Sequence, residues 1–177
     1  MMEKTTAFIG LGSNLGDGSK ILQGAWRRIG EAEGISLCAL SHPYLTAPVD
    51  MESSKVFTNA VGMLQTSLPV RQLLRDLLRI EFEFGRRRVA GSGYQDRSLD
   101  LDILSFGDLA VDTPELTLPH PRLDQRLFVL APFAEIAPDY RLLPGGPTTT
   151  ENWARLLAGM DRGRIPRQEI KKWQWEE

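Results

Sequence analysis

The chain has 177 residues, 42% of them hydrophobic and 25% charged, with a formal net charge of −2 at pH 7. This length and apolar content predict one globular domain over residues 1–177, and the acidic balance disfavours a general nucleic-acid binder. No apolar run approaches the ~20 residues of a membrane span, and the single cysteine, Cys38, excludes a disulfide scaffold and indicates a reducing, cytoplasmic setting.

The N-terminal stretch predicts a strand, a glycine-rich turn and a helix. Residues 5–11 form a short apolar run typical of a buried strand, and residues 10–17 form the turn. No Gly-Lys-Ser/Thr follows the glycines, so the turn is not a P-loop. Alone, it is either a plain connection or a phosphate cradle. An apolar stripe then predicts a helix packed on the core, with Ile21, Leu22, Ala25, Trp26 and Ile29.

Two further strands are predicted over residues 35–40 and 56–65, joined by a long loop over residues 41–54. In the second of these strands Phe57 and Asn59 share a face. A buried asparagine needs a hydrogen-bond partner, so Asn59 either faces such a partner or lies against solvent or a turn.

Residues 69–84 predict the second long helix, with Pro69 in the first turn. Its apolar stripe runs from Val70 to Leu78 and closes with Glu81. A carboxylate at that position either solvates the end of the helix or meets a ligand beside it.

The segment from Gly85 to Asp108 concentrates the chemistry of the chain. Residues 85–96 are polar and rich in glycine and arginine, which predicts a mobile basic loop. From Ser98 to Phe106 the pattern alternates, which predicts a central strand with one face in the core. Asp100 and Asp102 then point the same way, with Cα atoms roughly 6.5–7 Å apart.

Paired hard oxygen ligands suit Mg²⁺, which takes one or two carboxylates and leaves its other positions to water and phosphate. Taken separately, the aspartate pattern is typical of a solvated strand face, and the arginine run is typical of a solvated loop. Their adjacency favours a site for a polyphosphate with its Mg²⁺.

The C-terminal part carries fewer signals. An extended piece is predicted over residues 115–118, helices over 129–137 and 151–158, and a loop with His120 between two prolines. The last twenty or so residues look peripheral, and residues 171–175 contain no recognisable motif.

Residues 97–104, Arg-Ser-Leu-Asp-Leu-Asp-Ile-Leu, resemble the signature of the 6-hydroxymethyl-7,8-dihydropterin pyrophosphokinase family. The Gly-Ser-Asn-Leu-Gly turn and residues 119–128 resemble further blocks of that family. The resemblance covers about residues 5–140 and leaves a C-terminal extension, 141–177. It implies an α+β fold, a ferredoxin-like antiparallel sheet with helices packed mainly on one face.

The resemblance also implies an enzyme of folate biosynthesis, an ATP-dependent diphosphokinase. It would transfer pyrophosphate from ATP to 6-hydroxymethyl-7,8-dihydropterin, giving AMP and 6-hydroxymethyl-7,8-dihydropterin diphosphate. The family is often monomeric, and its partners are ATP and the pterin, with no nucleic acid and no membrane.

The implied catalytic residues are Arg86, Arg97, Asp100 and Asp102, and the two aspartates would hold two Mg²⁺ ions. The implied ATP contacts are Glu81, Arg86, Arg88, Tyr94, Arg97, Ile103, Thr117, His120 and Arg126. The implied pterin contacts are Gly12, Thr46, Ala47, Pro48, Val49, Phe57, Asn59, Asp100 and Phe128. Leu78, Glu115 and Pro121 depart from the family pattern, and these departures weaken the inference of the adenosine contacts from the resemblance.

Two other classes are open to the same elements. A non-catalytic nucleotide-binding ferredoxin-like sensor domain needs neither an acceptor pocket nor both aspartates, and Phe57, Asn59 and Phe128 argue against it. A single-strand RNA-binding module should show exposed aromatic residues and a basic sheet on its central strands. Here the strand expected at the centre carries aspartates.

Overall fold

The computed structural model describes residues 4–48, 53–87, 95–141, 149–150, 154 and 170–175. Its strands and helices are β1 (Thr5–Ser13), α1 (Gly18–Gly30), β2 (Ile35–Leu40), β3 (Tyr44–Thr46), β4 (Phe57–Thr66), α2 (Val70–Glu83), β5 (Asp100–Phe106), β6 (Val111–Asp112), β7 (Thr117–Leu118), α3 (Leu127–Ile136) and β8 (Ile170–Lys172). A short 3-10 turn covers Leu123–Gln125. The helix predicted over residues 151–158 lies largely outside the described residues.

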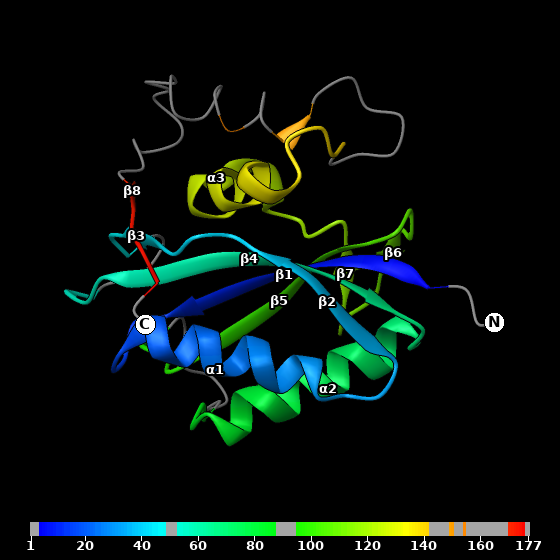
Figure 1. The fold of residues 1–177 in the computed structure, drawn as a ribbon, viewed down its shortest axis with the longest axis horizontal. Coiled ribbons are helices and arrows are strands. Elements are labelled where there is room, and N and C mark those ends of the chain that lie inside the picture. Colours follow the sequence, from blue (N-terminus) through cyan, green and yellow to red (C-terminus); the bar gives the residue numbers. More distant parts are fainter. Residues whose placement is uncertain are drawn as a thin grey trace.

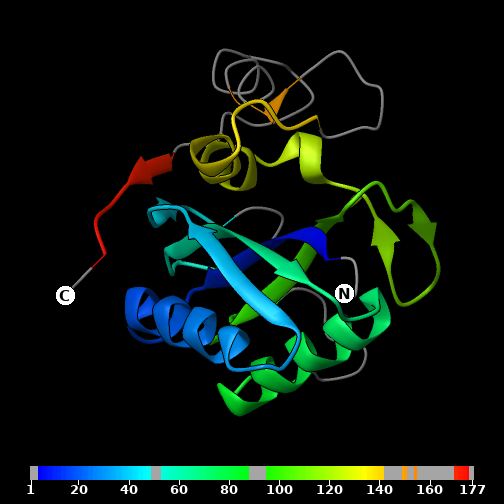
Figure 2. The same ribbon diagram turned by 45° about the vertical axis from the view of Figure 1, so that its right-hand side comes forward.

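The main sheet is antiparallel and has the strand order β5-β1-β4-β3-β8, with β2 also paired to β4. Helices α1 and α2 cover one face and α3 covers the other (Figure 1). The small β6-β7 hairpin projects to the side of the sheet (Figure 2). The predicted α+β sandwich is confirmed. No helix in the described ranges has the length and apolarity needed to cross a membrane.

The prediction that the aspartate strand is central was wrong. β5 ends the strand order and, in the described part of the chain, pairs with β1 alone, while β1 lies between β4 and β5. An alternating pattern reports which side chains share a face, but it says nothing about which strands lie beside one another. β5 is also buried on both faces in its second half, because Leu104 packs under α3 while Ile103 faces the other helices.

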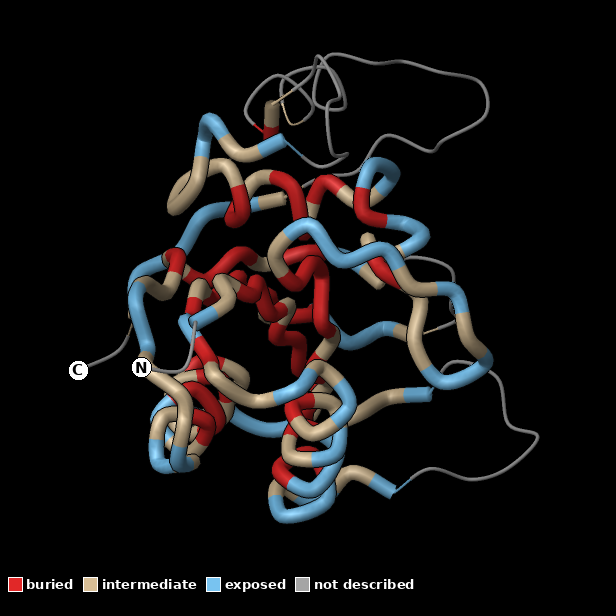
Figure 3. The backbone as a smooth tube through the Cα atoms, turned by 90° about the vertical axis from the view of Figure 1, so that its right-hand side faces the viewer, coloured by how far each residue is buried: buried red, intermediate tan, exposed pale blue. Residues whose placement is uncertain are grey.

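Two apolar layers hold the sheet, and buried residues concentrate along the strands between them (Figure 3). The layer under α1 and α2 contains Trp26, which lies on Gly62 of β4 so closely that a Cβ there would come within 2.3 Å of the indole. The layer under α3 contains Phe8 and Phe133, whose ring centroids are 4.4 Å apart. Leu104 and Val129 of this second layer also line the cavity that carries the candidate site.

The C-terminal segment is integrated into the fold rather than peripheral. β8 pairs antiparallel with β3, and the Trp175 indole donates a 3.1 Å hydrogen bond to the carbonyl of Ser41. Trp175 also packs against the first apolar layer. The expectation that the last residues are peripheral is therefore corrected for residues 170–175.

Candidate active site

One cavity of about 280 Å³ gathers most of the predicted site residues. Its predicted lining residues are Gly12, Thr46, Ala47, Phe57, Asn59, Arg86, Arg97, Asp100, Asp102, His120, Arg126 and Phe128. Sequence reasoning did not assign the other lining residues, which are Gly10, Leu11, Ala60, Leu104, Pro121, Arg122 and Val129.

Strand register builds the floor of this cavity. Gly12 of β1 lies opposite Asn59 of β4 on one side and opposite Asp100 of β5 on the other. A Cβ at Gly12 would lie 3.3 Å from the Asn59 Oδ1 atom and 3.9 Å from the Asp100 Cβ. Glycine therefore leaves an open shelf between the asparagine and the aspartate, and a side chain there would fill it.

The paired aspartates lie on β5, as the alternation predicted, and both line the cavity. Burial raises the pKa of Asp102 well above its ordinary value, and the neighbouring charge of Asp100 raises it further. The pair thus forms a concentration of negative charge that a cation would relieve. Protein guanidinium groups partly compensate this charge at Asp100.

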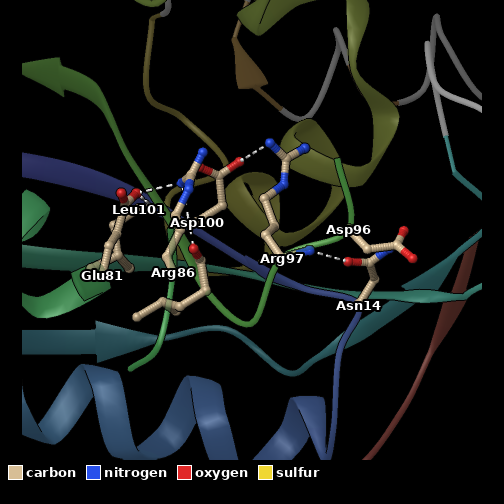
Figure 4. A network of polar contacts seen from close by, with 8 residues as sticks. Asn14, Glu81, Arg86, Asp96, Arg97, Asp100 and Leu101 are labelled. Carbon is tan, nitrogen blue, oxygen red and sulfur yellow. Dashed lines mark hydrogen bonds and ion pairs between the residues drawn. The ribbon is translucent and has the colours of Figure 1, made fainter. Parts of the chain in front are cut away.

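Arg86 links Asp100 to Glu81 (Figure 4). The Arg86 Nη1 atom donates to Glu81 Oε1 at 2.7 Å and also to Asp100 Oδ1. Glu81 is only 2% exposed, and the same Oε1 atom accepts from the backbone N–H of Leu101 at 2.8 Å. The Glu81 carboxylate therefore lies behind Arg86 and does not line the cavity.

Arg97 is fixed through its backbone by Asn14, which follows β1 (Figure 4). Asn14 N donates to the Arg97 carbonyl at 3.1 Å, and Arg97 N donates to Asn14 Oδ1 at 2.8 Å. The Arg97 guanidinium then reaches Asp100 Oδ2 at 3.2 Å and lies 5.6 Å from the Phe57 ring centroid. Sequence reasoning missed Asn14, although it is a polar residue inside the Gly-Ser-Asn-Leu-Gly turn.

Asp96, next to Arg97 in the chain, joins three loops. Its carboxylate accepts hydrogen bonds of 2.7 Å from Ser53 Oγ and from Asn14 Nδ2, and it pairs with Lys55 Nζ at 3.0 Å. The hydrogen bonds from Ser53, Lys55 and Asn14 lower the pKa of Asp96 to about 2. The ionised form is favoured in the folded protein, so this stabilisation is present above the ordinary pKa of 3.8 and is lost as the pH falls towards 2.

We therefore expect Asp96→Ala to lower the melting temperature at pH 7, by an amount that shrinks as the pH falls from 3.8 towards 2. Asp139→Ala, at an exposed position after α3, serves as the control and should show no such trend. Thermal unfolding across this pH range checks the expectation. A difference that stays constant with pH would contradict the role of the Asp96 charge.

The far wall of the cavity carries His120, Arg126 and Phe128. The backbone N–H of His120 donates to the Leu104 carbonyl at 2.9 Å, which fixes the loop against β5. Burial lowers the pKa of His120 to about 4, and the charge of Arg126 contributes to the same shift. The Arg126 Nε atom is a buried donor with no hydrogen-bond partner among the described residues, and the guanidinium lies 5.6 Å from the Phe128 ring centroid.

Among the described residues, Pro48, Ile103 and Thr117 were predicted to belong to the site but do not line this cavity. Ile103 is buried under the helices, and Thr117 on β7 donates to Asp112 at 3.2 Å. Pro48 is half-buried beyond the end of β3. Val49, Arg88 and Tyr94 lie outside the described residues, as does most of the basic loop expected over residues 85–96.

The same cavity also combines an amide with aromatic rings. Asn59 is 6% exposed, and its Nδ2 atom donates to Thr46 Oγ1 at 3.0 Å. Phe57 and Phe128 line the same cavity. A flat polar heterocycle would find ring faces and an amide carrying both a donor and an acceptor here.

The donor set also fits a divalent cation. Within the described ranges no group of three or more His, Cys, Asp or Glu side chains could hold a metal by itself. Asp100 and Asp102 would supply carboxylate oxygens, and the other positions would be filled by water and bound phosphate. Mg²⁺ prefers this kind of incomplete protein shell.

Fold and site together define a class of enzyme. A carboxylate pair flanked by arginines is suited to a phosphate chain with its cation, and the nearby amide and aromatic rings are suited to a flat acceptor. This combination is typical of a phosphoryl- or pyrophosphoryl-transferring enzyme on an α+β sandwich. The family model of 7,8-dihydro-6-hydroxymethylpterin-pyrophosphokinase (HPPK) matches residues 8–138. The chain belongs to this family.

Curated relatives agree with this assignment. The 2-amino-4-hydroxy-6-hydroxymethyldihydropteridine pyrophosphokinase of Methylorubrum extorquens is 40% identical over 159 residues, which cover 89% of this chain and 98% of the relative. The protein of the same name from Bacillus subtilis is 41% identical over 130 residues, which cover 73% of this chain and 77% of the relative.

A solved structure of the Plasmodium falciparum HPPK-DHPS protein shows the same fold. It superposes with a TM-score of 0.72 at 13% sequence identity and covers 97% of this chain. The match spans 49% of that longer chain, so about half of the Plasmodium protein has no counterpart here.

Proposed function

We propose that this protein transfers the β,γ-diphosphate of ATP to the hydroxymethyl oxygen of 6-hydroxymethyl-7,8-dihydropterin, giving AMP and the pterin diphosphate. The observation that carries the proposal is the shared cavity, in which Gly12 lies between Asp100 on β5 and Asn59 on β4, and arginines and aromatic rings belong to the same lining. The names of the relatives support the same reaction.

The transfer forms a bond between the acceptor oxygen and the β-phosphorus. It breaks the bond from that phosphorus to the oxygen bridging the α- and β-phosphates, and AMP leaves with this oxygen. The hydroxyl proton is released. The chain contributes positioning and electrostatic stabilisation rather than a covalent intermediate.

Asp100 and Asp102 would hold Mg²⁺, as two ions in this proposal. When bound, Mg²⁺ screens phosphate oxygens and lowers the pKa of a coordinated hydroxyl. Arg86 and Arg97 line the cavity and contact Asp100 in the described structure, and they would turn towards phosphate once a cation compensates that aspartate. Arg126 offers its unpaired Nε–H from the opposite wall.

His120 acts first as a neutral ring. Its pKa of about 4 means that it carries no charge at neutral pH before a ligand binds, because burial and Arg126 disfavour the imidazolium. The negative charge of a phosphate beside the ring would raise the pKa of His120 and so favour its protonated form.

Asn59 would hold the polar edge of the pterin. We expect Asn59→Ala to weaken pterin binding by about 1–3 kcal/mol, since a buried polar edge loses its partner, and to leave ATP binding unchanged. Titration calorimetry with each ligand separately measures both. Thr58→Ala on the same strand is the control, because Thr58 does not line the cavity. Equal weakening of both ligands would show that Asn59 supports the structure instead.

The test of the reaction is the identity of the nucleotide product. Incubated with ATP, Mg²⁺ and the pterin, the protein should release AMP in equal amount to the pterin diphosphate and no ADP. Release of ADP, or nucleotide turnover that does not depend on the pterin, would disprove the proposal. We further propose that the enzyme acts as a monomer in the cytoplasm. Residues of a single chain line the described part of the cavity, and Cys38 is an exposed free thiol, which suits reducing conditions.

A further inference from the structure

A second polar cluster lies away from the cavity and is centred on Glu135 of α3. The Glu135 Oε1 atom accepts from the backbone N–H of His42 at 2.8 Å and contacts His42 Nδ1 at 2.6 Å. The Oε2 atom accepts from the Tyr44 hydroxyl at 2.8 Å and pairs with Lys172 Nζ at 3.1 Å. One carboxylate therefore joins α3, the loop before β3, β3 itself and β8.

This carboxylate stays ionised. Partial burial acts to raise its pKa, but the hydrogen bonds from His42, Tyr44 and Lys172 outweigh burial and hold the pKa of Glu135 at about 2. Burial and the Glu135 charge in turn raise the pKa of the Tyr44 hydroxyl, which remains a donor. The Glu135 carboxylate is thus a charged acceptor at neutral pH, and its hydrogen bonds are charge-assisted.

The elements that Glu135 joins carry or neighbour the residues proposed to bind the flat acceptor, which are Thr46, Phe57, Asn59 and Phe128. On β3, Tyr44 lies opposite Asn59 of β4, and Thr46 lies opposite Phe57. On the other side of β3 the partners belong to β8, where Tyr44 lies opposite Lys172. Helix α3, on which Glu135 lies, carries Phe128 in its first turn.

β3 is only three residues long, and β8 covers its outer side. A strand this short is weakly held when only one neighbour pairs with it. Beyond β8, Trp173 N donates to the Pro43 carbonyl at 2.8 Å and the Trp175 indole donates to the Ser41 carbonyl at 3.1 Å. The tail therefore fixes both the strand and the loop that leads into it.

We propose that Glu135 and β8 form a clamp that positions β3, and through it Thr46 and Asn59, for binding of the flat acceptor. This rests on the proposed function of the cavity. Glu135 and Lys172 do not line the cavity, so they are positioning residues that act through the Thr46–Asn59 hydrogen bond. Asp100 and Asp102 lie on β5, and Arg86 and Arg97 lie in the loop before it, so these four residues should be insensitive to the clamp.

The test compares two clamp variants with a matched control in the full-length protein. Glu135→Gln keeps the shape but removes the charge, and Lys172→Met removes the exposed partner without disturbing the core. Glu83→Gln is the control, because Glu83 accepts from Arg28 Nε at 2.9 Å between α1 and α2, far from β3. We expect Glu135→Gln to raise the KM for the pterin about tenfold, which corresponds to the loss of about one hydrogen bond. The KM for ATP should stay within about twofold of the wild-type value.

Lys172→Met should raise the KM for the pterin less than Glu135→Gln does, because the ion pair between Lys172 and Glu135 is half exposed. Lys172→Arg keeps the charge and should leave this KM at the wild-type value. Glu83→Gln should change neither KM. Hydrogen exchange of the amides of residues 44–46, measured without ligands, should be faster in the clamp variants only. This measurement does not depend on catalysis, so it tests the clamp even if wild-type protein forms no AMP. Unchanged exchange and pterin KM in Glu135→Gln, or equal loss for both substrates, would overturn the proposal.

Discussion

Replacing either cavity aspartate by asparagine should reduce turnover by about 10³-fold or more, because metal-assisted charge stabilisation supplies several kcal/mol of the rate enhancement. Asp100→Asn and Asp102→Asn each keep the size of the side chain and remove one anionic oxygen ligand. With so few protein ligands available at this site, the loss of one leaves the cation poorly held.

Folding stability should respond differently at the two positions. The raised pKa of Asp102, caused first by burial and then by Asp100, means that its ionised form is disfavoured in the folded protein. Asp102→Asn should therefore melt at the wild-type temperature or above it. Asp100→Asn should melt slightly lower, because Arg86 and Arg97 lose a charged partner.

Asp108→Asn provides the control, since Asp108 is exposed just after β5. It should retain wild-type turnover and melting temperature. Steady-state kinetics, thermal unfolding and Mg²⁺ titration calorimetry on the three variants decide the question. Near-wild-type turnover in both cavity variants would reject the metal assignment.

The aspartate pair was predictable because period-2 alternation is a local property of the sequence. Placing Asp100 and Asp102 on one face required only the geometry of a strand. The shelf at Gly12 was not predictable in the same way. It depends on β1 pairing with β4 and β5 at once, and this register is set by contacts between segments far apart in the chain.

The partners of Glu81 could not be predicted from the sequence either. Its place at the end of an apolar stripe marked it as unusual, and the family resemblance suggested a nucleotide contact. The structure instead buries its carboxylate against the N–H of Leu101 and the guanidinium of Arg86. A backbone donor leaves no trace in residue type, so the sequence could not reveal this partner.

The C-terminal strand was missed for a related reason. Residues 170–172 are too few and too polar to produce a convincing strand pattern, and they pair with β3 across more than a hundred residues of sequence. The contacts that hold this segment in place are made with distant residues, among them Glu135 and Ser41, and the sequence does not reveal them.

Replacement of Arg86 should impair both stability and catalysis, and the two effects can be separated. Arg86 is largely buried and contacts Glu81, which is 2% exposed, together with Asp100. Arg86→Met leaves the buried Glu81 charge without this partner, which should lower the free energy of unfolding by about 3 kcal/mol. Turnover should fall by about 10³-fold, because the cation proposed to contact the phosphates is lost.

The double variant Arg86→Met with Glu81→Gln distinguishes the two causes. The introduced glutamine side chain would keep an oxygen acceptor for the Leu101 N–H but carry no charge, so most of the lost stability should return while turnover stays low. Arg87→Met is the control, since Arg87 is exposed and stacks on the Phe82 ring at 4.2 Å. Urea unfolding and kinetics measure both quantities. If turnover returned together with stability, Arg86 would be a purely structural partner of Glu81, and its proposed contact with phosphate would be wrong.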